Sequence, residues 1–261
     1  MSVPKALTIA GSDSGGGAGI QADLKTFTAF RVFGLSVLTA VTAQNSLGVQ
    51  GVFNLPPEFV ARQIDSVLSD FGADAVKIGM LSTAPIIEAV AARLGAHRHG
   101  SVVLDPVMIA KSGDPLLEPA ARTALIKMLP LADLVTPNLP EAAALADMTV
   151  DDERAMVDAA RRIFALGPRA VLVKGGHLKD SATDVLWDGR DLTRFPAPKL
   201  DSPNTHGTGC TYSSAIAAGL ARGRPLRDAI IDGKAYVTAA IREGFPAGRG
   251  VGALRHFVER W

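Results

Sequence analysis

The fold class is decided near the start of the chain, by Ala6-Leu7-Thr8-Ile9-Ala10-Gly11-Ser12-Asp13-Ser14-Gly15-Gly16-Gly17-Ala18-Gly19-Ile20-Gln21-Ala22-Asp23. An apolar run of strand length leads into a loop with five glycines, and a helical pattern follows. Glycine permits positive φ angles and lets a ligand approach the backbone closely. The loop has neither the Gly-Lys-[Ser/Thr] ending of a Walker A loop nor a clean GxGxxG fingerprint. This stretch therefore predicts a strand, a tight loop and a helix, but specifies no ligand.

The same order of short apolar run and longer helical pattern recurs along the chain. Strands are predicted at residues 6–10, 36–42, 75–78, 102–104, 134–136 and 170–173, all apolar on both faces as buried parallel strands are. Helical stripes occupy residues 57–71 and 151–167 and follow Pro225. Thr149 with Asp152 is typical of a capping box. The alternation indicates an α/β fold with a central, mostly parallel sheet flanked by helices.

A different pattern marks residues 183–187 and 192–196. Asp188-Gly189 stands between these two apolar runs, which is typical of a β-hairpin and predicts an antiparallel edge of the sheet. No linker, charge block or internal repeat interrupts the chain. A single domain over residues 1–261 is therefore expected.

Composition excludes several classes of protein. Of the 261 residues, 48% are hydrophobic and 20% charged, which is enough to bury a large core. Lys and Arg number 27 against 26 for Asp and Glu, so no basic excess indicates a nucleic acid or an anionic membrane as partner. The one cysteine, Cys210, excludes an intrachain disulfide and a cysteine-rich zinc site. There is no apolar run of about 18 residues and no signal-peptide pattern, so a cytoplasmic protein without a membrane span is expected.

Glycine and polar residues follow each predicted parallel strand. They are Gly11-Ser12-Asp13, Gln44-Asn45, Gly79-Met80, Asp105-Pro106, Pro137-Asn138 and Lys174-Gly175. The carboxyl ends of parallel strands share one edge of a sheet, and open α/β sheets bind their ligands at that edge. A single polar loop proves little, because most such loops are polar, but six together predict a ligand site.

A second glycine-containing segment opens a helix of small residues, His206-Gly207-Thr208-Gly209-Cys210-Thr211. Backbone N–H groups converge at such a helix N-terminus, and the helix dipole adds positive charge there. This predicts an anion site fit for a transferring phosphoryl group. Cys210 would lie in the first turn, where the pKa of a thiol tends to fall. A buried structural cysteine is the competing interpretation, but the position after Gly-Thr-Gly favours a functional role. His206 and His177 show no partner pattern and are interpreted as structural.

Four charged residues extend this site. Lys174 directly follows a buried strand and suits a phosphate contact, with a surface lysine as the alternative. Asp105 and Glu141, on neighbouring loops, suit a magnesium ion held through water, whereas either acid alone is more often a helix cap or a surface charge. Asp23 lies one turn inside the first helix, where it either caps the helix or faces a ligand.

Several segments resemble a known family. The glycine-rich start, residues 136–141 (Thr-Pro-Asn-Leu-Pro-Glu), residues 174–177 (Lys-Gly-Gly-His) and residues 206–211 are similar to the ribokinase-like superfamily. Four further segments resemble one family within this superfamily. They are residues 10–13, 21–27, 77–81 and 105–113, the last of which includes Lys111 and Ser112. The narrower match is the hydroxymethylpyrimidine kinase / phosphomethylpyrimidine kinase family of thiamine biosynthesis. The resemblance covers nearly the whole chain, to His256-Phe257.

The resemblance implies a three-layer ribokinase-like α/β fold and two ATP-dependent steps at one site. Hydroxymethyl-aminopyrimidine would become its monophosphate and then its diphosphate, with ATP as co-substrate, Mg²⁺ as cofactor and a homodimer as the common assembly. A pyridoxal-type kinase on the same fold is the nearest rival, because its substrate is also a hydroxymethyl heteroaromatic. A catalytically silent ligand-binding protein is the rival of another class.

At the positions where the family's motifs match this chain, the resemblance implies roles for individual residues. Gln44 would hydrogen-bond the pyrimidine, whose amino edge needs both a donor and an acceptor, in a pocket lined by Gly11, Asp23, Met80 and Val107. ATP would be bound by Lys174, Asn138, Gly207, Thr208 and Gly209. The Mg²⁺ ion would be supported by Asp105 and Glu141. Cys210 would stand where sugar kinases of the superfamily carry an aspartate base, which argues against a sugar kinase. We predict Cys210 and Lys174 as the catalytic residues. The place of Cys210 after Gly207-Thr208-Gly209 favours a role as proton acceptor, with a packing residue as the alternative.

Overall fold

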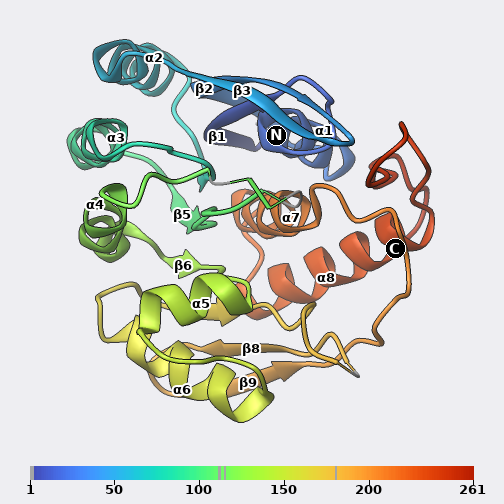
Figure 1. The fold of residues 1–261 in the computed structure, drawn as a ribbon. Helices are drawn as coiled ribbons and strands as arrows, with labels where there is room; N and C mark the ends of the chain where they lie inside the picture. Colours follow the sequence, from blue (N-terminus) through green and yellow to red (C-terminus); the bar gives the residue numbers. More distant parts are fainter. Residues whose placement is uncertain (1–2, 111–112, 115, 180) are drawn as a thin grey trace.

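One mixed sheet forms the centre of the molecule (Figure 1). The computed structural model describes residues 3–110, 113–114, 116–179 and 181–261, so Lys111 and Ser112 of the family motif lie outside the described residues. Within that part of the chain the sheet has nine strands, in the order β3-β2-β1-β4-β5-β6-β7-β8-β9. The strands are β1 (Lys5–Asp13), β2 (Phe33–Asn45), β3 (Gly48–Asn54), β4 (Ala75–Ile78), β5 (Ser101–Leu104), β6 (Leu134–Val135), β7 (Val171–Val173), β8 (Asp184–Trp187) and β9 (Leu192–Phe195).

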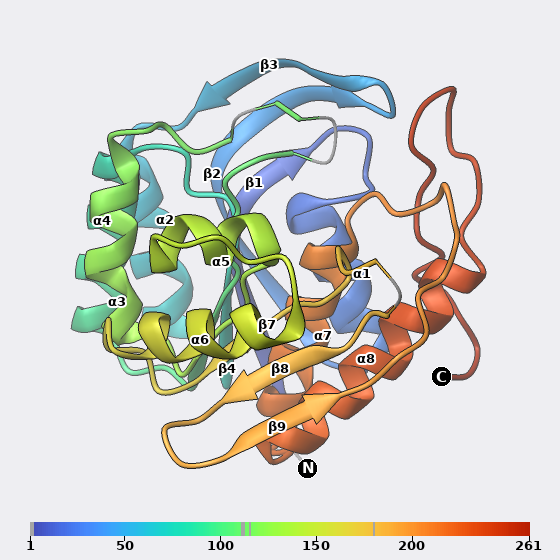
Figure 2. The same ribbon diagram turned by 60° about the horizontal axis from the view of Figure 1, so that its bottom comes forward.

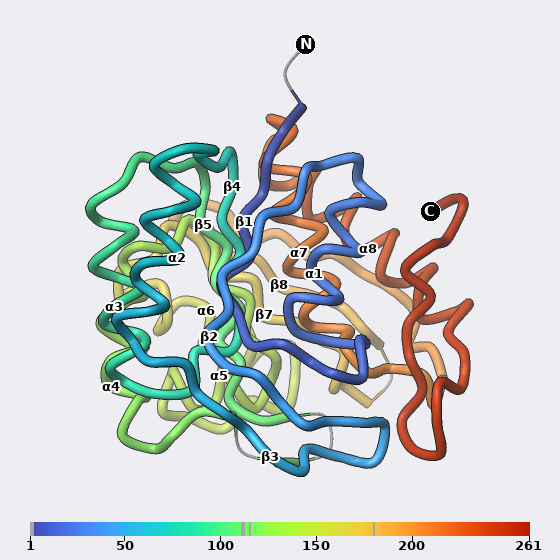
Figure 3. Tube along the Cα trace, turned by 90° about the horizontal axis from the view of Figure 1, so that it is seen from above, coloured from blue at the N-terminus to red at the C-terminus, as the bar shows by residue number. Residues whose placement is uncertain are grey.

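Helices cover both faces of this sheet and give the predicted three layers (Figure 3). One face carries α1 (Gly19–Ala29), α7 (Thr208–Ala221) and α8 (Leu226–Arg242). The other carries α2 (Pro57–Asp70), α3 (Ala84–Ala96), α4 (Ala121–Met128), the short 3-10 helix Leu129–Leu131, α5 (Leu139–Ala146) and α6 (Glu153–Phe164). Each face has its own apolar core. Among the described residues, no helix has the length and apolar character that a membrane crossing needs.

The winding of the chain places a crevice at the end of β1. This strand pairs in parallel with β2 on one side and with β4 on the other. The helix that follows β1 and the helix that follows β4 cover opposite faces of the sheet (Figure 3). The loops after these two neighbouring strands therefore diverge, and such a switch point is where open α/β sheets bind their ligands.

The strand predictions hold except at one edge of the sheet. All six predicted parallel strands form, and β4 has its predicted bounds. The predicted hairpin is confirmed as the antiparallel pair β8 and β9. The opposite edge is β3, which pairs antiparallel with β2 and was not predicted (Figure 2). Its residues are exposed or half-buried and two of them are glycine, so it lacks the apolar alternation that marks a strand.

The capping box predicted at Thr149 and Asp152 is wrong. Helix α6 begins at Glu153, and Asp152 is its N-cap, since the Asp152 carboxylate accepts the N–H of Ala155 at 2.7 Å. A capping box occurs instead at the start of α5, where Asn138 and Glu141 bond each other's backbone. In both places an oxygen side chain satisfies helix N–H groups that have no partner within the helix.

Candidate active site

A cavity of about 600 Å³ opens at the carboxyl edge of the sheet. Its wall is formed by the ends of β1 and β2, the loops after β4, β5, β6 and β7, and the start of α7. Every site residue predicted from the sequence lies on this wall except Asp23. Those on the wall are Gly11, Gln44, Met80, Asp105, Val107, Asn138, Glu141, Lys174, Gly207, Thr208, Gly209 and Cys210.

The turn at the start of α7, residues 207–209, is here called the anion turn. Gly207 is the N-cap of the helix and has φ +83°, a conformation that favours glycine. A Cβ atom at this position would lie 1.8 Å from the carbonyl oxygen of Gly17 in the glycine-rich loop. The two glycine segments of the sequence are therefore in direct backbone contact, and both line the cavity.

Gly207→Ala is expected to displace the anion turn. Alanine at a positive φ costs about 1–2 kcal/mol, and the clash with Gly17 forces the backbone apart in addition. A displacement near 1 Å at a reacting site costs roughly a hundredfold in rate, so kcat should fall by about that factor. Gly223→Ala is the matched control, because Gly223 has φ +76° but open space around its Cβ position. It should lower the melting temperature and leave kcat unchanged; equal effects of both variants on kcat would contradict the assignment.

Asp13 ties the glycine-rich loop to the anion turn. Its carboxylate accepts the backbone N–H groups of Gly15, Gly17 and Ala18 at 2.8, 3.0 and 2.8 Å. The same carboxylate lies 2.9 Å from Nε2 of His206. Burial raises the pKa of Asp13, but the hydrogen bonds from His206 and from the loop backbone lower it by more. Asp13 is thus an anion that fixes both segments, and the histidine interpreted as structural has a defined partner at the cavity wall.

Lys174 is a buried ammonium and not a surface lysine. Its Nζ lies 2.6 Å from Oδ1 of Asp105, whose side chain is 2% exposed. Asp105 also accepts hydrogen bonds from the hydroxyls of Thr136 and Ser213 at 3.1 and 3.3 Å. Burial lowers the pKa of Lys174, but the carboxylates of Asp105 and Glu141 raise it by more. A Cβ atom on Gly209 would lie 3.3 Å from Nζ, so the charge sits directly against the anion turn.

Glu141 and Asn138 cap α5 at the cavity wall. Glu141 accepts the backbone N–H of Asn138 at 2.8 Å, and Asn138 accepts that of Glu141 at 2.9 Å. Burial is the main reason that the pKa of Glu141 is raised to about 7, with the carboxylate of Asp105 adding to it and Lys174 opposing it. Glu141 was interpreted from the sequence as a residue that supports magnesium or as a helix cap, and the structure shows that it caps a helix.

The two carboxylates do not fit a directly bound magnesium ion. Both oxygens of Asp105 are engaged, one by Lys174 and Thr136 and the other by Ser213. The Lys174 ammonium occupies the place that a cation would need beside Asp105. In the described part of the chain, no three His, Cys, Asp or Glu residues are grouped as in a metal site built from protein ligands alone.

Cys210 lies in the first turn of α7, half-buried at the cavity wall. Burial raises the pKa of its thiol to about 11; Lys77 opposes this shift, and the carboxylates of Asp23 and Asp105 add to it. The expectation that the helix N-terminus lowers this pKa is therefore wrong. Desolvation is the largest cause of the raised pKa and the two carboxylates add to it, so the thiol is protonated at neutral pH.

Gln44 marks the opposite side of the cavity, at the end of β2. Its side-chain oxygen lies 3.2 Å from the hydroxyl of Thr42, which orients the amide. Gly11 and Met80, which also line the cavity, pack together, since a Cβ atom on Gly11 would lie 3.0 Å from the sulfur of Met80. The cavity thus combines an amide at Gln44, an apolar contact at Met80 and a charge at Lys174, which suits a ring with a polar edge next to a phosphate.

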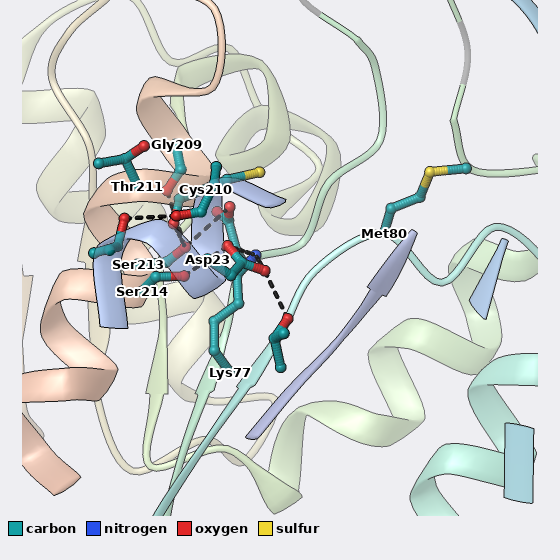
Figure 4. Close-up of polar contacts among 12 residues, drawn as sticks. Asp23, Lys77, Met80, Gly209, Cys210, Thr211, Ser213 and Ser214 are labelled. Carbon is teal, nitrogen blue, oxygen red and sulfur yellow. Dashed lines mark hydrogen bonds and ion pairs between the residues drawn. The ribbon is translucent and has the colours of Figure 1, made fainter. Parts of the chain in front are cut away.

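Asp23 lies beneath the cavity wall, so neither interpretation of it from the sequence is right. It is fully buried, while the N-cap of α1 is Ala18. Its carboxylate is held by Lys77 and Ser214 (Figure 4), and it also accepts a hydrogen bond from the hydroxyl of Thr8. Lys77 was missed, although the sequence carries a signal for it. A lone lysine in a strand that is otherwise apolar must be buried with a partner.

The far end of the cavity carries a polar cluster that the sequence did not predict. Asp184 accepts hydrogen bonds from the Tyr212 hydroxyl at 2.9 Å and the Lys234 ammonium at 2.5 Å. Its other oxygen accepts the N–H of Gly175, next to Lys174. The cluster joins β8, α7 and α8, which are distant in sequence, so no local pattern could have found it.

Comparisons with known proteins identify the family. A family model described as phosphomethylpyrimidine kinase matches residues 13–255. The thiamine biosynthesis bifunctional protein ThiED of Geobacter sulfurreducens is 55% identical over 97% of this chain, which spans about half (52%) of that relative. The hydroxymethylpyrimidine/phosphomethylpyrimidine kinase of Salmonella typhimurium is 50% identical, with 98% of each chain covered.

A solved structure has the same fold as this chain. The ADP complex of Bacillus subtilis pyridoxal kinase superposes with a TM-score of 0.91 at 43% identity, and 98% of each chain is covered. The region matched by the family model takes in the anion turn, Lys174 and Gln44, and it begins at Asp13. By this match, and by its identity to full-length relatives, the chain belongs to the phosphomethylpyrimidine kinase family.

Proposed function

We propose that this chain phosphorylates hydroxymethyl-aminopyrimidine to its monophosphate and then to its diphosphate, in thiamine biosynthesis, with ATP as the donor. The observation that carries this proposal is the buried Lys174 ammonium against Gly209 of the anion turn, beside Cys210. Phosphoryl transfer depends mostly on positioning and charge stabilisation, and this arrangement supplies both. The family match and the name of the Salmonella relative support the substrate. The ADP complex of the structural relative supports the use of ATP.

The anion turn and Lys174 would hold the phosphates of ATP. Backbone N–H groups at the start of α7 point toward the cavity, and the dipole of this helix of 14 residues favours negative charge there. Lys174 adds a full positive charge that Asp105 keeps in place. Asn138 and Thr208 line the same part of the cavity. Charge that develops on the transferring phosphoryl group would meet preorganised donors, which is the main source of catalysis in such sites.

Cys210 would accept the proton of the substrate hydroxyl. Its thiolate would take that proton, the substrate oxygen would bond to the γ-phosphorus of ATP, and the bond from phosphorus to ADP would break. The high pKa of the thiol makes the thiolate a minor form at neutral pH. Turnover at neutral pH would therefore depend on this small fraction of thiolate.

Magnesium would accompany ATP and be held by the phosphates themselves. Mg²⁺ commonly keeps several waters and takes one or two carboxylates besides the phosphates of its nucleotide. Glu141 lines the cavity and would face the ion through water, whereas Asp105 is committed to Lys174.

Gln44→Ala is expected to weaken pyrimidine binding and to leave ATP binding unchanged. Loss of a hydrogen bond to a buried polar partner costs about 1–3 kcal/mol, which is roughly 5- to 150-fold in affinity. Steady-state kinetics should show this as a higher KM for the pyrimidine at an unchanged KM for ATP. Gln50→Ala is the control, because Gln50 lies exposed on the same hairpin, outside the cavity. Wild-type values of KM and kcat/KM for the pyrimidine in Gln44→Ala would refute the assignment.

A pyridoxal-type kinase is the second candidate, since the structural relative with a TM-score of 0.91 is named as one. A substrate panel separates the two candidates. ATP consumption would be measured with hydroxymethyl-aminopyrimidine, with its monophosphate and with pyridoxal. We expect the highest kcat/KM values with the two pyrimidines. Turnover of pyridoxal alone would replace the proposed substrate, and no ATP consumption with any of the three would leave a silent ligand-binding protein.

A homodimer and a cytoplasmic location are further parts of this proposal. Val41, Leu47, Val52 and Phe53 are exposed along β2 and β3, which supports an apolar contact between two copies at this edge. Light scattering of the purified chain should give twice the mass of 27.2 kDa. A monomer at micromolar concentration would contradict this part alone.

A further inference from the structure

Lys77 and Asp23 form a fully buried ion pair at the cavity, with Lys77 on its wall and Asp23 behind it. The Lys77 Nζ lies 2.9 Å from both carboxylate oxygens of Asp23, and both side chains are 0% exposed. Lys77 stands in β4, whose other three residues are apolar. A buried pair of this kind is often no more stabilising than two well-packed apolar side chains. Stability alone therefore does not account for these two charges.

The pair is connected to the helix that carries Cys210. One Asp23 oxygen accepts the hydroxyl of Ser214 at 2.6 Å, and the other accepts the hydroxyl of Thr8 at 2.6 Å. Ser214 lies four residues after Cys210, which places both on the same face of α7, one turn apart. Figure 4 shows Lys77 and Asp23 reaching toward this face of the helix. The carboxylate thus fastens β1, β4 and the first turns of α7 together.

The pair also sets the charges around the thiol. The charged side chains near Cys210 in the described part of the chain include Lys77 from β4, Asp23 from α1, Asp105 after β5 and Lys174 after β7. Among the charges, Lys77 has the largest effect on the pKa of Cys210 and lowers it, while the two carboxylates raise it. Burial lowers the pKa of Lys77 itself, but Asp23, Cys210 and Asp105 raise it by more, so the ammonium persists.

We propose that Lys77 is a positioning residue for Cys210: held by Asp23 beneath the first turns of α7, it fixes the place of the thiol and supplies the positive charge that a thiolate there requires. Asp23 therefore acts through Lys77 and α7 and not by touching the pyrimidine. This inference rests on the proposed role of Cys210 as proton acceptor.

Alkylation of Cys210 tests this inference directly. Cys210 is the only cysteine of the chain, so iodoacetamide labelling followed by mass spectrometry reports on this thiol alone. The rate would be measured from pH 7 to 10 on the full chain without ligands. Lys77→Met and Asp23→Asn each remove one partner of the pair. At pH 8 we expect alkylation about threefold or more slower in Lys77→Met and about threefold or more faster in Asp23→Asn, because only the thiolate reacts.

The opposite signs separate a charge effect from a structural one. If the pair were only a brace, either variant would loosen α7 and expose the thiol, and both rates would rise. Equal directions, or wild-type rates in both variants, would overturn the proposal. Thr8→Val is the matched control, since it removes a hydrogen bond to the same carboxylate but no charge. It should alkylate at the wild-type rate; a change as large as that in Lys77→Met would overturn the proposal as well.

A double variant covers the case in which Lys77→Met does not fold. Lys77→Met with Asp23→Leu replaces the pair by apolar side chains and leaves Asp105 and Lys174 as charges near the thiol. Because Lys77 affects the thiol more than Asp23 does, alkylation should still be slower than in the wild type, and an equal rate would overturn the proposal. The labelling needs neither ATP nor a pyrimidine. If no substrate of the panel were turned over, the proposed function would be refuted, but the alkylation rates would still test the role of Lys77.

Discussion

Lys174→Met is expected to lower kcat for both phosphorylation steps by about 10²–10³-fold, the usual cost of removing one preorganised donor from a charge-stabilising site. Lys174 is the ammonium that lies against Gly209 of the anion turn. Methionine keeps the length and the apolar stem of lysine, so the variant removes the charge and little else. Both steps would use one ATP site, and a coupled assay with the pyrimidine and then with its monophosphate should show equal losses.

The same variant should also be less stable. It leaves the carboxylate of Asp105 buried without its partner, and breaking a buried ion pair in this way costs about 3–5 kcal/mol. Burial raises the pKa of Asp105, but Lys174 and Lys77 lower it by more, so the wild-type pair stabilises the fold above the ordinary aspartate pKa. This stabilisation is lost as the pH falls through the lowered pKa. The difference in unfolding free energy between variant and wild type should therefore be larger at pH 7 than at low pH.

Lys127→Met is the control for both effects, because Lys127 is exposed on α4 and lies outside the cavity. It should keep the wild-type kcat and melting temperature. Loss of only one of the two phosphorylation steps in Lys174→Met would contradict a shared site. A kcat within a few-fold of the wild type for both steps would remove Lys174 from the catalytic residues.

Cys210→Ala is expected to lower kcat by about 10²–10⁴-fold, the usual contribution of a positioned base. The pH profile should change as well. A thiol with a pKa of about 11 is almost fully protonated at pH 7, and its thiolate fraction rises about tenfold per pH unit below that pKa. Wild-type kcat should therefore rise between pH 7 and pH 9 at saturating substrates, and this rise should be absent in the variant.

Cys210→Ser separates chemistry from packing. Serine nearly matches the size of cysteine, but its hydroxyl is a far weaker acid and remains protonated in this range. The serine variant should fold as the wild type does and show the same loss of kcat as Cys210→Ala. If Cys210→Ala keeps kcat within a few-fold of the wild type with an unchanged pH profile, Cys210 is a packing residue and the anion turn with Lys174 is the main catalyst.

Local patterns in the sequence were enough for the parallel part of the fold. Buried parallel strands are apolar on both faces, so β1, β4 and β5 stand out as short apolar runs between helical stripes. The grouping of Gly11, Gln44, Asn138 and Lys174 at one cavity was also predictable, because the carboxyl ends of parallel strands share an edge. The exposed edge strand β3 was missed, since pairing with β2 forms it and no apolar pattern marks it.

The sequence by itself therefore determined the α/β fold, the edge that holds the site and a set of candidate residues that, except for Asp23, all lie on the cavity wall. Only the tertiary structure decided the partners and the ionisation of these residues. Lys174 meets Asp105 across 69 residues of chain, and Asp23 meets Lys77 across 54. These contacts hold Asp23 beneath the wall and commit Asp105 to an ammonium, while burial is the main cause of the raised pKa of Cys210. The physical reason is that a charge interacts with whatever surrounds it in space and with how much water remains there, and neither quantity is encoded within a local window of sequence.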